Sequence, residues 1–284
     1  MKQKYFHLVL GILILSLFGA LFYNLSFKSY LLNEYPYIYQ EYYGEDNRVI
    51  IVPIIGDLVT SQDKENPNSI KTDRDLDADK IAEFMKAKSK DEGVKGFILE
   101  IDTFGGNTVS DEIMKQTIED IELPIISVVK DHALSNGISL SSYSDYVFIS
   151  PLSDIGDIGI INMMGLDNIK GSGEVLCWVP SSKFKSVYLP QCDKSLINPL
   201  VYLNFRDNAI NDVVAGEMEF IKAIAEARNL SFEEVLEVGQ GKIMTGKEAV
   251  ERGLADKFGN MNDALKWFEE REGKELRLEF TPIF

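Results

Sequence analysis

Three short, continuous apolar runs restrict the folds open to this chain more than any other feature of its sequence. They are GFILEI (residues 96–101), PIISVV (124–129) and YVFIS (146–150). A strand with one face in water alternates apolar and polar residues, whereas a strand covered on both faces is apolar throughout. Stretches with helical spacing separate the runs, as parallel βα units require. The sequence therefore predicts an α/β fold around a buried parallel sheet.

The same reasoning assigns the other elements from Arg48 onward. Gly, Pro and polar clusters predict loops, and apolar residues three or four apart predict amphipathic helices that begin at Thr or Asn caps. The further expected elements are a strand at 49–59, a polar loop at 61–75, a turn at 131–134 (DHAL), and helices at 78–91, from Val109 onward, at 204–228, at 245–254 and at 261–270.

The N-terminal region differs from the rest of the chain. Residues 6–25 (FHLVLGILILSLFGALFYNL) are almost wholly apolar and long enough to cross a bilayer of about 30 Å. A cleaved signal peptide is the alternative, but no small-residue cleavage site follows the apolar run, so we favour an uncleaved transmembrane anchor. Lys2 and Lys4 precede the span and an acidic, Tyr-rich segment follows it, which predicts a cytoplasmic N-terminus. The expected organisation is an N-terminus with anchor at 1–28, a linker at 29–47 and one main domain at 48–284.

Charge and cysteine content exclude several classes of partner. The chain has 29 Lys+Arg against 45 Asp+Glu, a formal net charge of -16, and no basic stripe, so nucleic acid is not an expected partner. Cys177 and Cys192 do not have metal-ligand spacing with the two histidines, and we expect neither a metal nor a cofactor. These cysteines either pair in an oxidising compartment or remain free thiols.

Ser135 is the candidate nucleophile, in the stretch DHALSNGISLSSYSD (131–145). A serine at a helix start is more often only a cap. His132 is the one histidine outside the apolar N-terminal segment, and on a tight turn three residues away it is poorly placed to take the Ser135 proton while an acid orients its far nitrogen. A lysine kept neutral by burial is the remaining well-attested base for an activated serine.

The turn after GFILEI holds a second candidate feature, the glycine pair in DTFGGN (102–107). Paired glycines let the backbone approach a ligand and direct an N–H group outward. A tight βα turn accounts for the same pair, and the pair alone does not separate the two interpretations.

Five motifs in order resemble those of the signal peptide peptidase A family, membrane-anchored Ser/Lys peptidases with the spiral βα fold of the Clp protease and crotonases. The resemblance runs from about Arg48 to Glu270. The motifs are ILEIDTFGG, similar to a strand followed by S-P-G-G; ALSNGISLSSYSDYVFISP, similar to the A-S-G-G-Y stretch; GDIGII, similar to G-S-I-G-V; SSKFKS, similar to G-x-Y-K; and GKIMTGKEAVERGLADKFG, similar to the closing G-R-x-x-T-G stretch.

The resemblance implies a role for each matching residue. Ser135 corresponds to the nucleophile and Lys185 to the general base, and the backbone N–H groups of Gly106 and Asn136 correspond to the oxyanion hole. It also implies a homo-oligomer, in which the serine and lysine of one site can come from neighbouring subunits. The implied function is a serine endopeptidase that cleaves short apolar peptides, such as signal-peptide remnants or membrane-protein fragments, on the outer side of a bacterial cytoplasmic membrane.

Three positions depart from the family pattern. Phe104 replaces a proline, Asn136 replaces a glycine, and Asp157 occupies the place of the serine that helps to orient the lysine amine. A carboxylate beside an amine favours the ammonium form, which cannot act as a base. Either Asp157 points away, or the enzyme works at raised pH, or catalysis is lost. An inactive membrane scaffold and a crotonase-type acyl-CoA enzyme are therefore the alternative functions.

Overall fold

The computed structural model describes residues 46–65, 74–166, 175–181, 185 and 199–281. These residues belong to one compact unit, Glu45–Phe284. The apolar segment 6–25, with its expected anchor, and the side chains of both cysteines lie outside the described residues. Within the described ranges, no helix is both long enough and apolar enough to cross a bilayer.

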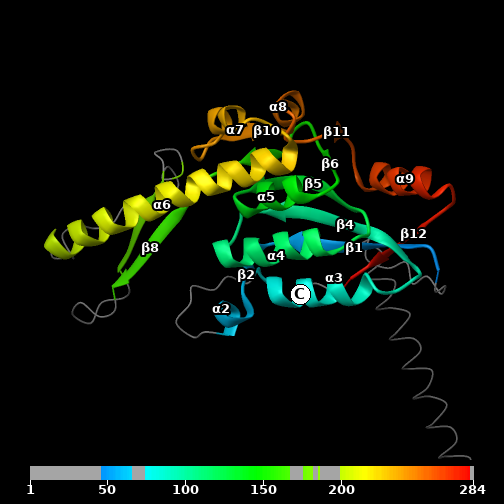
Figure 1. Ribbon diagram of the computed structural model, residues 1–284, viewed down its shortest axis with the longest axis horizontal. Coiled ribbons are helices and arrows are strands. Elements are labelled where there is room, and N and C mark those ends of the chain that lie inside the picture. Colours follow the sequence, from blue (N-terminus) through cyan, green and yellow to red (C-terminus); the bar gives the residue numbers. More distant parts are fainter. Residues whose placement is uncertain (1–45, 66–73, 167–174, 182–184, 186–198, 282–284) are drawn as a thin grey trace, which may run out of the picture. The chain divides into compact units, whose positions relative to one another are not determined.

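The centre of this unit is an eight-stranded sheet (Figure 1). Its main path runs β10 (Ile243–Thr245), β7 (Asp154–Gly156), β5 (Ile125–Leu134), β4 (Val94–Thr103), β1 (Arg48–Ile55) and β12 (Arg277–Phe280), while β6 (Tyr146–Ile149) pairs with β5, and β11 (Lys257–Phe258) with β6. All these pairs are parallel except β10 with β7. The predicted α/β class with a parallel sheet is confirmed, and its arrangement as a crotonase-like spiral stays a prediction.

Burial on both faces of the sheet explains the continuous apolar runs. In β1, Ile50 and Val52 belong to one hydrophobic core, while Val49 and Ile51 belong to a second core on the opposite face. All four side chains are fully buried. Phe268 of helix α9 (Met261–Glu272) completes the second core. Alternate residues of one strand thus face two different apolar layers, which leaves no position for a polar side chain.

The helices on the first face pack against one another in succession. These are α3 (Ala78–Lys88), α4 (Thr108–Asp120), α5 (Asn136–Tyr143) and α6 (Pro199–Arg228), and Figure 1 shows the first three side by side along the sheet with α6 crossing above α5. The smaller elements are α2 (Ser61–Glu65), α7 (Phe232–Val238), α8 (Gly246–Glu251), and two two-stranded sheets, β2 (Asp57–Val59) with β3 (Asp75–Asp77) and β8 (Ile161–Leu166) with β9 (Val175–Pro180).

Three sequence expectations about these elements are wrong. The strand expected at 49–59 is broken at Gly56, whose φ of 135° separates β1 from β2. The polar loop expected at 61–75 contains helix α2. The turn expected at 131–134 is the second half of β5, because His132 and Leu134 there pair with Asp154 and Gly156 of β7. That pairing is formed with a strand more than 20 residues away, and a local pattern cannot reveal it.

Opposite β4, strand β5 pairs with two strands in succession, β6 and then β7, and this positions the residues that follow it. Residues 126–129 pair with β6, whereas residues 132–134 pair with β7. The last paired residues are Leu134 and Gly156, so the segment after each strand starts at the same edge of the sheet. Ser135 and Asp157 are therefore the first residues beyond two neighbouring parallel strands, the place where α/β proteins commonly gather functional side chains.

Candidate active site

Ser135 occupies the N-cap position of α5 in an unusual backbone conformation. Its φ is 52° and its ψ is -117°, and its side chain makes no capping hydrogen bond. Its backbone N–H donates to the carbonyl oxygen of Gly156 at 2.9 Å. A non-glycine residue with positive φ is uncommon and costs of order 1–3 kcal/mol, and such residues cluster at functional sites. The interpretation of Ser135 as an ordinary helix cap is wrong, because its hydroxyl group is not used to cap α5.

The glycine pair of DTFGGN lies directly against this serine. A Cβ atom added at Gly105 would lie 2.7 Å from the Ser135 Cβ and 3.2 Å from its Oγ, so only glycine permits this approach. A Cβ added at Gly106 would lie 2.1 Å from the Leu58 carbonyl oxygen. The loop is fixed to β2, since Leu58 N–H donates to the Gly105 carbonyl and Asn107 N–H to the Leu58 carbonyl. In such a parallel bridge the N–H of Gly106 points away from β2.

Asn136 begins α5 with its side chain buried. Its side-chain amide donates to the carbonyl oxygen of Asn107 at 2.8 Å, and the Asn107 side chain in turn caps α4 by accepting from Ser110 N–H. The starts of α4 and α5 are thereby joined beside the glycine pair. The structure thus brings Ser135, Gly106 and Asn136 into one loop cluster beside the starts of α4 and α5.

Lys185 and Asp157 form an ion pair next to this cluster. The Lys185 Nζ donates to Asp157 Oδ2 at 2.6 Å and to the Asp157 carbonyl oxygen at 2.8 Å. The lysine side chain is only 5% exposed. Of the possibilities left open by the sequence, a side chain of Asp157 that points away from the amine does not describe this structure. The Ser135 N–H bond to Gly156 connects the loop cluster to the residue before Asp157.

Burial and charge act in opposite directions on this pair. Burial lowers the pKa of Lys185 below its ordinary value, although the carboxylates of Asp157 and Glu217 oppose that shift. Burial likewise raises the pKa of Asp157, and the neighbouring Lys185 counteracts it. Both shifts favour the uncharged forms, because removing a charge from water is costly. Burial thus moves the lysine toward the neutral amine that a general base requires.

Glu217 of α6 is a third ionisable residue in this cluster, and sequence reasoning missed it. It is 3% exposed, and its Oε1 has no hydrogen-bond partner in the described part of the chain. A Cβ added at Gly159 would lie 3.5 Å from that oxygen and 3.5 Å from Lys185 Cδ, so both side chains converge there. Burial raises the pKa of Glu217. In the sequence it is one of several acids in an amphipathic helix, and nothing marks it as the buried one.

His132 and Asp102 form a second acid–base pair near Ser135. The His132 Nδ1 and Asp102 Oδ1 atoms lie 2.9 Å apart, and the His132 N–H also donates to Asp102 Oδ1 at 3.2 Å. Phe104 packs on the imidazole, with ring centroids 4.6 Å apart. The sequence argument against His132 assumed that this residue lies on a tight turn. The structure instead places His132 on strand β5 with an acid on its Nδ1.

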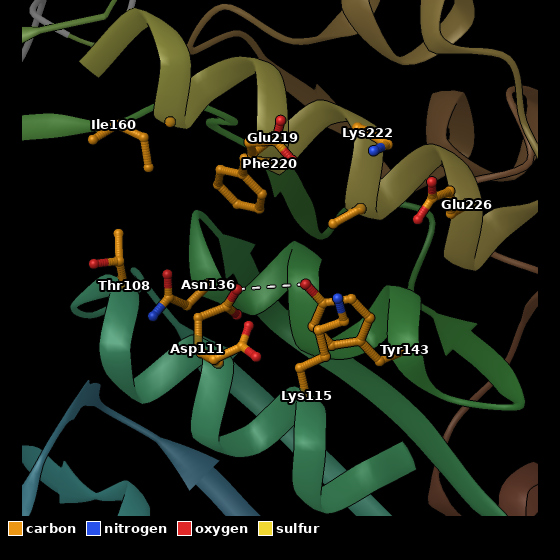
Figure 2. A pocket seen from close by; sticks show the side chains of 13 residues that line it. Thr108, Asp111, Lys115, Asn136, Tyr143, Ile160, Glu219, Phe220, Lys222 and Glu226 are labelled. Atoms are coloured by element: carbon orange, nitrogen blue, oxygen red, sulfur yellow. Dashed lines mark hydrogen bonds between the residues drawn. The ribbon is translucent and has the colours of Figure 1, made fainter. Parts of the chain in front are cut away.

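A pocket of about 450 Å³ opens between α4, α5 and α6 (Figure 2). Asn136 lines one part of it, next to Thr108 at the start of α4. Asp111 and Tyr143 lie deeper, and the Tyr143 hydroxyl donates to Asp111 Oδ2 at 3.4 Å. The pocket therefore adjoins the loop cluster of Ser135. Within the described ranges, no group of three or more His, Cys, Asp or Glu side chains is arranged to hold a metal ion.

Comparison with known proteins identifies relatives of this chain. Residues 117–276, more than half of the chain, match the family described as Peptidase family S49. The chain is 26% identical over 241 residues to Protease 4 of Haemophilus influenzae, covering 81% of this chain and 36% of that protein. It is 33% identical over 186 residues to the protein named "Putative signal peptide peptidase SppA" of Enterococcus faecium, covering 64% of this chain and 52% of that protein. The chain thus spans between about a third and a half of the length of these relatives.

Proposed function

Since this chain belongs to peptidase family S49, the signal peptide peptidase A family, we propose that it is a serine peptidase with Ser135 as nucleophile and Lys185 as general base. The observation that carries the proposal is the conformation of Ser135. Its positive φ and its uncapped helix start leave the hydroxyl group available for chemistry. The close approach of Gly105 supports the same role, because it brings a backbone loop to the reacting oxygen.

The base in this proposal is the neutral amine of Lys185. The amine takes the proton of the Ser135 hydroxyl while Oγ forms a bond to the substrate carbonyl carbon, and it then gives that proton to the leaving amine as the C–N bond breaks. A water molecule repeats the sequence on the acyl-enzyme and restores the serine. Burial supports this role because it lowers the pKa of Lys185. In the resting structure the amine is bound to Asp157, so the base becomes available as the pH rises.

The oxyanion in this proposal is held by backbone N–H groups. The negative charge on the carbonyl oxygen develops only in the tetrahedral state, so donors fixed in advance stabilise that state selectively. We assign these donors to Gly106 and Asn136. The direction of the Gly106 N–H away from β2 and the junction between the starts of α4 and α5 support this assignment.

The wider assignments follow from the family resemblance. We propose a homo-oligomer at the outer face of a bacterial cytoplasmic membrane, anchored by a single span at residues 6–25. The proposed substrates are short peptides, such as signal-peptide remnants or membrane-protein fragments. In this arrangement the serine and the lysine of one site can belong to neighbouring subunits.

An inactive scaffold is the second candidate function, and the Lys185–Asp157 ion pair favours it. An ammonium held at 2.6 Å by a carboxylate cannot accept a proton. A protein that keeps this pair intact at every pH in its working range has the fold of a peptidase without its activity.

Labelling with a serine-directed fluorophosphonate separates the two functions. The wild-type protein is expected to be labelled at one site, and Ser135→Ala to lose the label. Ser89→Ala is the matched control, because Ser89 is a partly exposed serine at the end of α3, and this change should leave labelling unchanged. Absence of labelling in a folded wild-type protein between pH 7 and 10 would contradict the peptidase and favour the scaffold.

A further inference from the structure

The pocket between α4, α5 and α6, here called the α4–α6 pocket, contains a partly buried acid, Asp111, that no part of the proposed mechanism uses. Asp111 Oδ2 accepts the Tyr143 hydroxyl, while its Oδ1 is buried without a hydrogen-bond partner in the described part of the chain. None of the ion pairs in these described ranges includes Asp111. A buried carboxylate without a cation is costly, so a positively charged ligand would stabilise it.

The other side chains of the pocket fit the two ends of a lysine or arginine side chain. Ile160 and Phe220 supply apolar surface, against which the aliphatic part of such a side chain can lie. Around them, the lining holds four carboxylates and two amines, contributed by Asp111, Glu112, Glu219, Glu226, Lys115 and Lys222. The pocket is therefore net negative, which disfavours an acidic side chain, and an apolar side chain would leave Asp111 uncompensated.

The pocket lies beside the residues that we propose hold the carbonyl oxygen of the cleaved bond. Thr108 and Asn136 line the pocket. Asn136 is one of the proposed oxyanion donors, and Thr108 lies two residues after the other, Gly106. A substrate carbonyl held by Gly106 and Asn136 would therefore direct the side chain of its own residue toward this pocket. The residue before the scissile bond is thus the one that the pocket selects.

We propose that the α4–α6 pocket is a specificity site for a lysine or arginine residue immediately before the scissile bond, with Asp111 as its acidic partner. This inference rests on the proposed peptidase function and narrows its substrates to peptides with a basic residue at that position. Asp111 acts here in binding and takes no part in proton transfer to or from the substrate bond.

The charge of Asp111 makes this preference depend on pH. Burial raises the pKa of Asp111 to about 6, although the hydroxyl groups of Ser139 and Tyr143 oppose that shift. The nearby charge of Glu112 adds to the rise, and that of Lys115 opposes it. The Lys115 amine lies 5.8 Å from the ring centroid of Tyr143, and the charged groups of α6 that line the same pocket are Glu219, Lys222 and Glu226. Above pH 6 the carboxylate is charged and favours a basic side chain. Below pH 6 it is neutral and this preference disappears.

The test compares peptides that differ only in the residue before the scissile bond, which is lysine, norleucine or glutamate. Norleucine has the four-carbon chain of lysine without its terminal amine. At pH 8 the wild-type protein is expected to cleave the lysine peptide with a kcat/KM about tenfold above that of the norleucine peptide. Asp111→Asn should bring this ratio to about one. Glu119→Gln, on the exposed face of the same helix, should leave the ratio unchanged.

Two further measurements keep the outcome decisive. Fluorophosphonate labelling tests Ser135 as nucleophile without any substrate side chain. A protein that is labelled but prefers the norleucine peptide would overturn the assignment of the pocket alone. A protein that is not labelled would overturn the proposed peptidase function. If Asp111→Asn does not fold, the wild-type protein decides, because the lysine-to-norleucine ratio should fall as the pH drops through about 6. A ratio independent of pH would overturn the role of Asp111.

Discussion

The structure contains two acid–base pairs beside neighbouring strands, and they differ mainly in their contact with water. Lys185 and Asp157 lie 2.6 Å apart with side chains 5% and 23% exposed, whereas His132 and Asp102 lie 2.9 Å apart with side chains 32% and 29% exposed. Both pairs are near Ser135, since His132 is in β5 and Asp157 follows β7. The distance between the two partners of each pair therefore does not decide which pair supplies the general base.

Desolvation distinguishes the two pairs. A charge in contact with water is screened, so an ion pair at the surface changes little in the chemistry of its partners. Water does not screen the buried pair in this way, and burial lowers the pKa of Lys185, which favours its neutral form. The comparison favours the buried lysine as the base, although the histidine has the acid partner of a Ser-His-Asp site.

The largest expected effect comes from removing the proposed base or nucleophile. Lys185→Met and Ser135→Ala should each lower kcat by about a thousandfold or more, and the double variant should lose little beyond either single one, because residues that act as a unit are not additive. Peptide hydrolysis and thermal unfolding, measured on the same preparations, check this. A folded Lys185→Met enzyme with near wild-type kcat would show that Lys185 is not the general base.

A smaller effect is expected from Asp157→Ser, which removes the carboxylate that stabilises the Lys185 ammonium. A lysine base is active only when neutral, and loss of the carboxylate lowers its pKa, so the rise of kcat/KM with pH should move to lower pH. A shift of one pH unit would raise activity at neutral pH about tenfold. A pH titration of both proteins on one peptide measures the shift. A pH profile identical to that of the wild type would show that the Asp157 carboxylate does not affect the pKa of the general base.

Glu217→Gln should shift the same profile in the same direction by less. The carboxylate of Glu217 also raises the pKa of Lys185, but the direct hydrogen bonds of the amine go to Asp157. We expect roughly a threefold gain at neutral pH, about half a unit of pKa. Asp212→Asn, an exposed acid of the same helix outside the pocket lining, is the control for charge removal from α6 and should leave the profile in place. A shift toward higher pH in Glu217→Gln would contradict the role assigned to its charge.

The smallest effect is expected at the partly exposed pair of His132 and Asp102. His132→Gln should keep kcat within about threefold of wild type, because the half-buried imidazole is not the proton acceptor in the proposed mechanism. Activity assays with the same peptide check this, with Asp102→Asn as a second variant of the pair. A loss of about a thousandfold in His132→Gln, with an active Lys185→Met, would replace the lysine base by a histidine.

The sequence predicts the part of this site that depends on local pattern. The apolar runs give the parallel sheet, and small residues after two of these strands mark Ser135 and the glycine pair. The family resemblance adds Lys185 and Asp157, which the structure pairs. The Ser/Lys chemistry itself stays a prediction.

What the sequence does not predict depends on packing between distant elements. The turn expected at His132 fails because β7 extends the sheet along the second half of β5. Glu217 and Asp111 each lie on an amphipathic helix, and the helical period alone does not tell which acid faces a buried neighbour. The contacts between α4, α5 and α6 decide this, and each spans many residues of sequence.

One helix, α6, connects two properties that an engineer would want to change separately. Within a single turn, Glu217 faces the lysine cluster while Gly216, Glu219 and Phe220 line the α4–α6 pocket. A library that randomises this turn would therefore alter the working pH and the residue selected before the cleaved bond together, since any displacement of the helix backbone moves both sets. Variants with a new selectivity at an unchanged pH profile are to be sought on α4, where Asp111 lines the pocket.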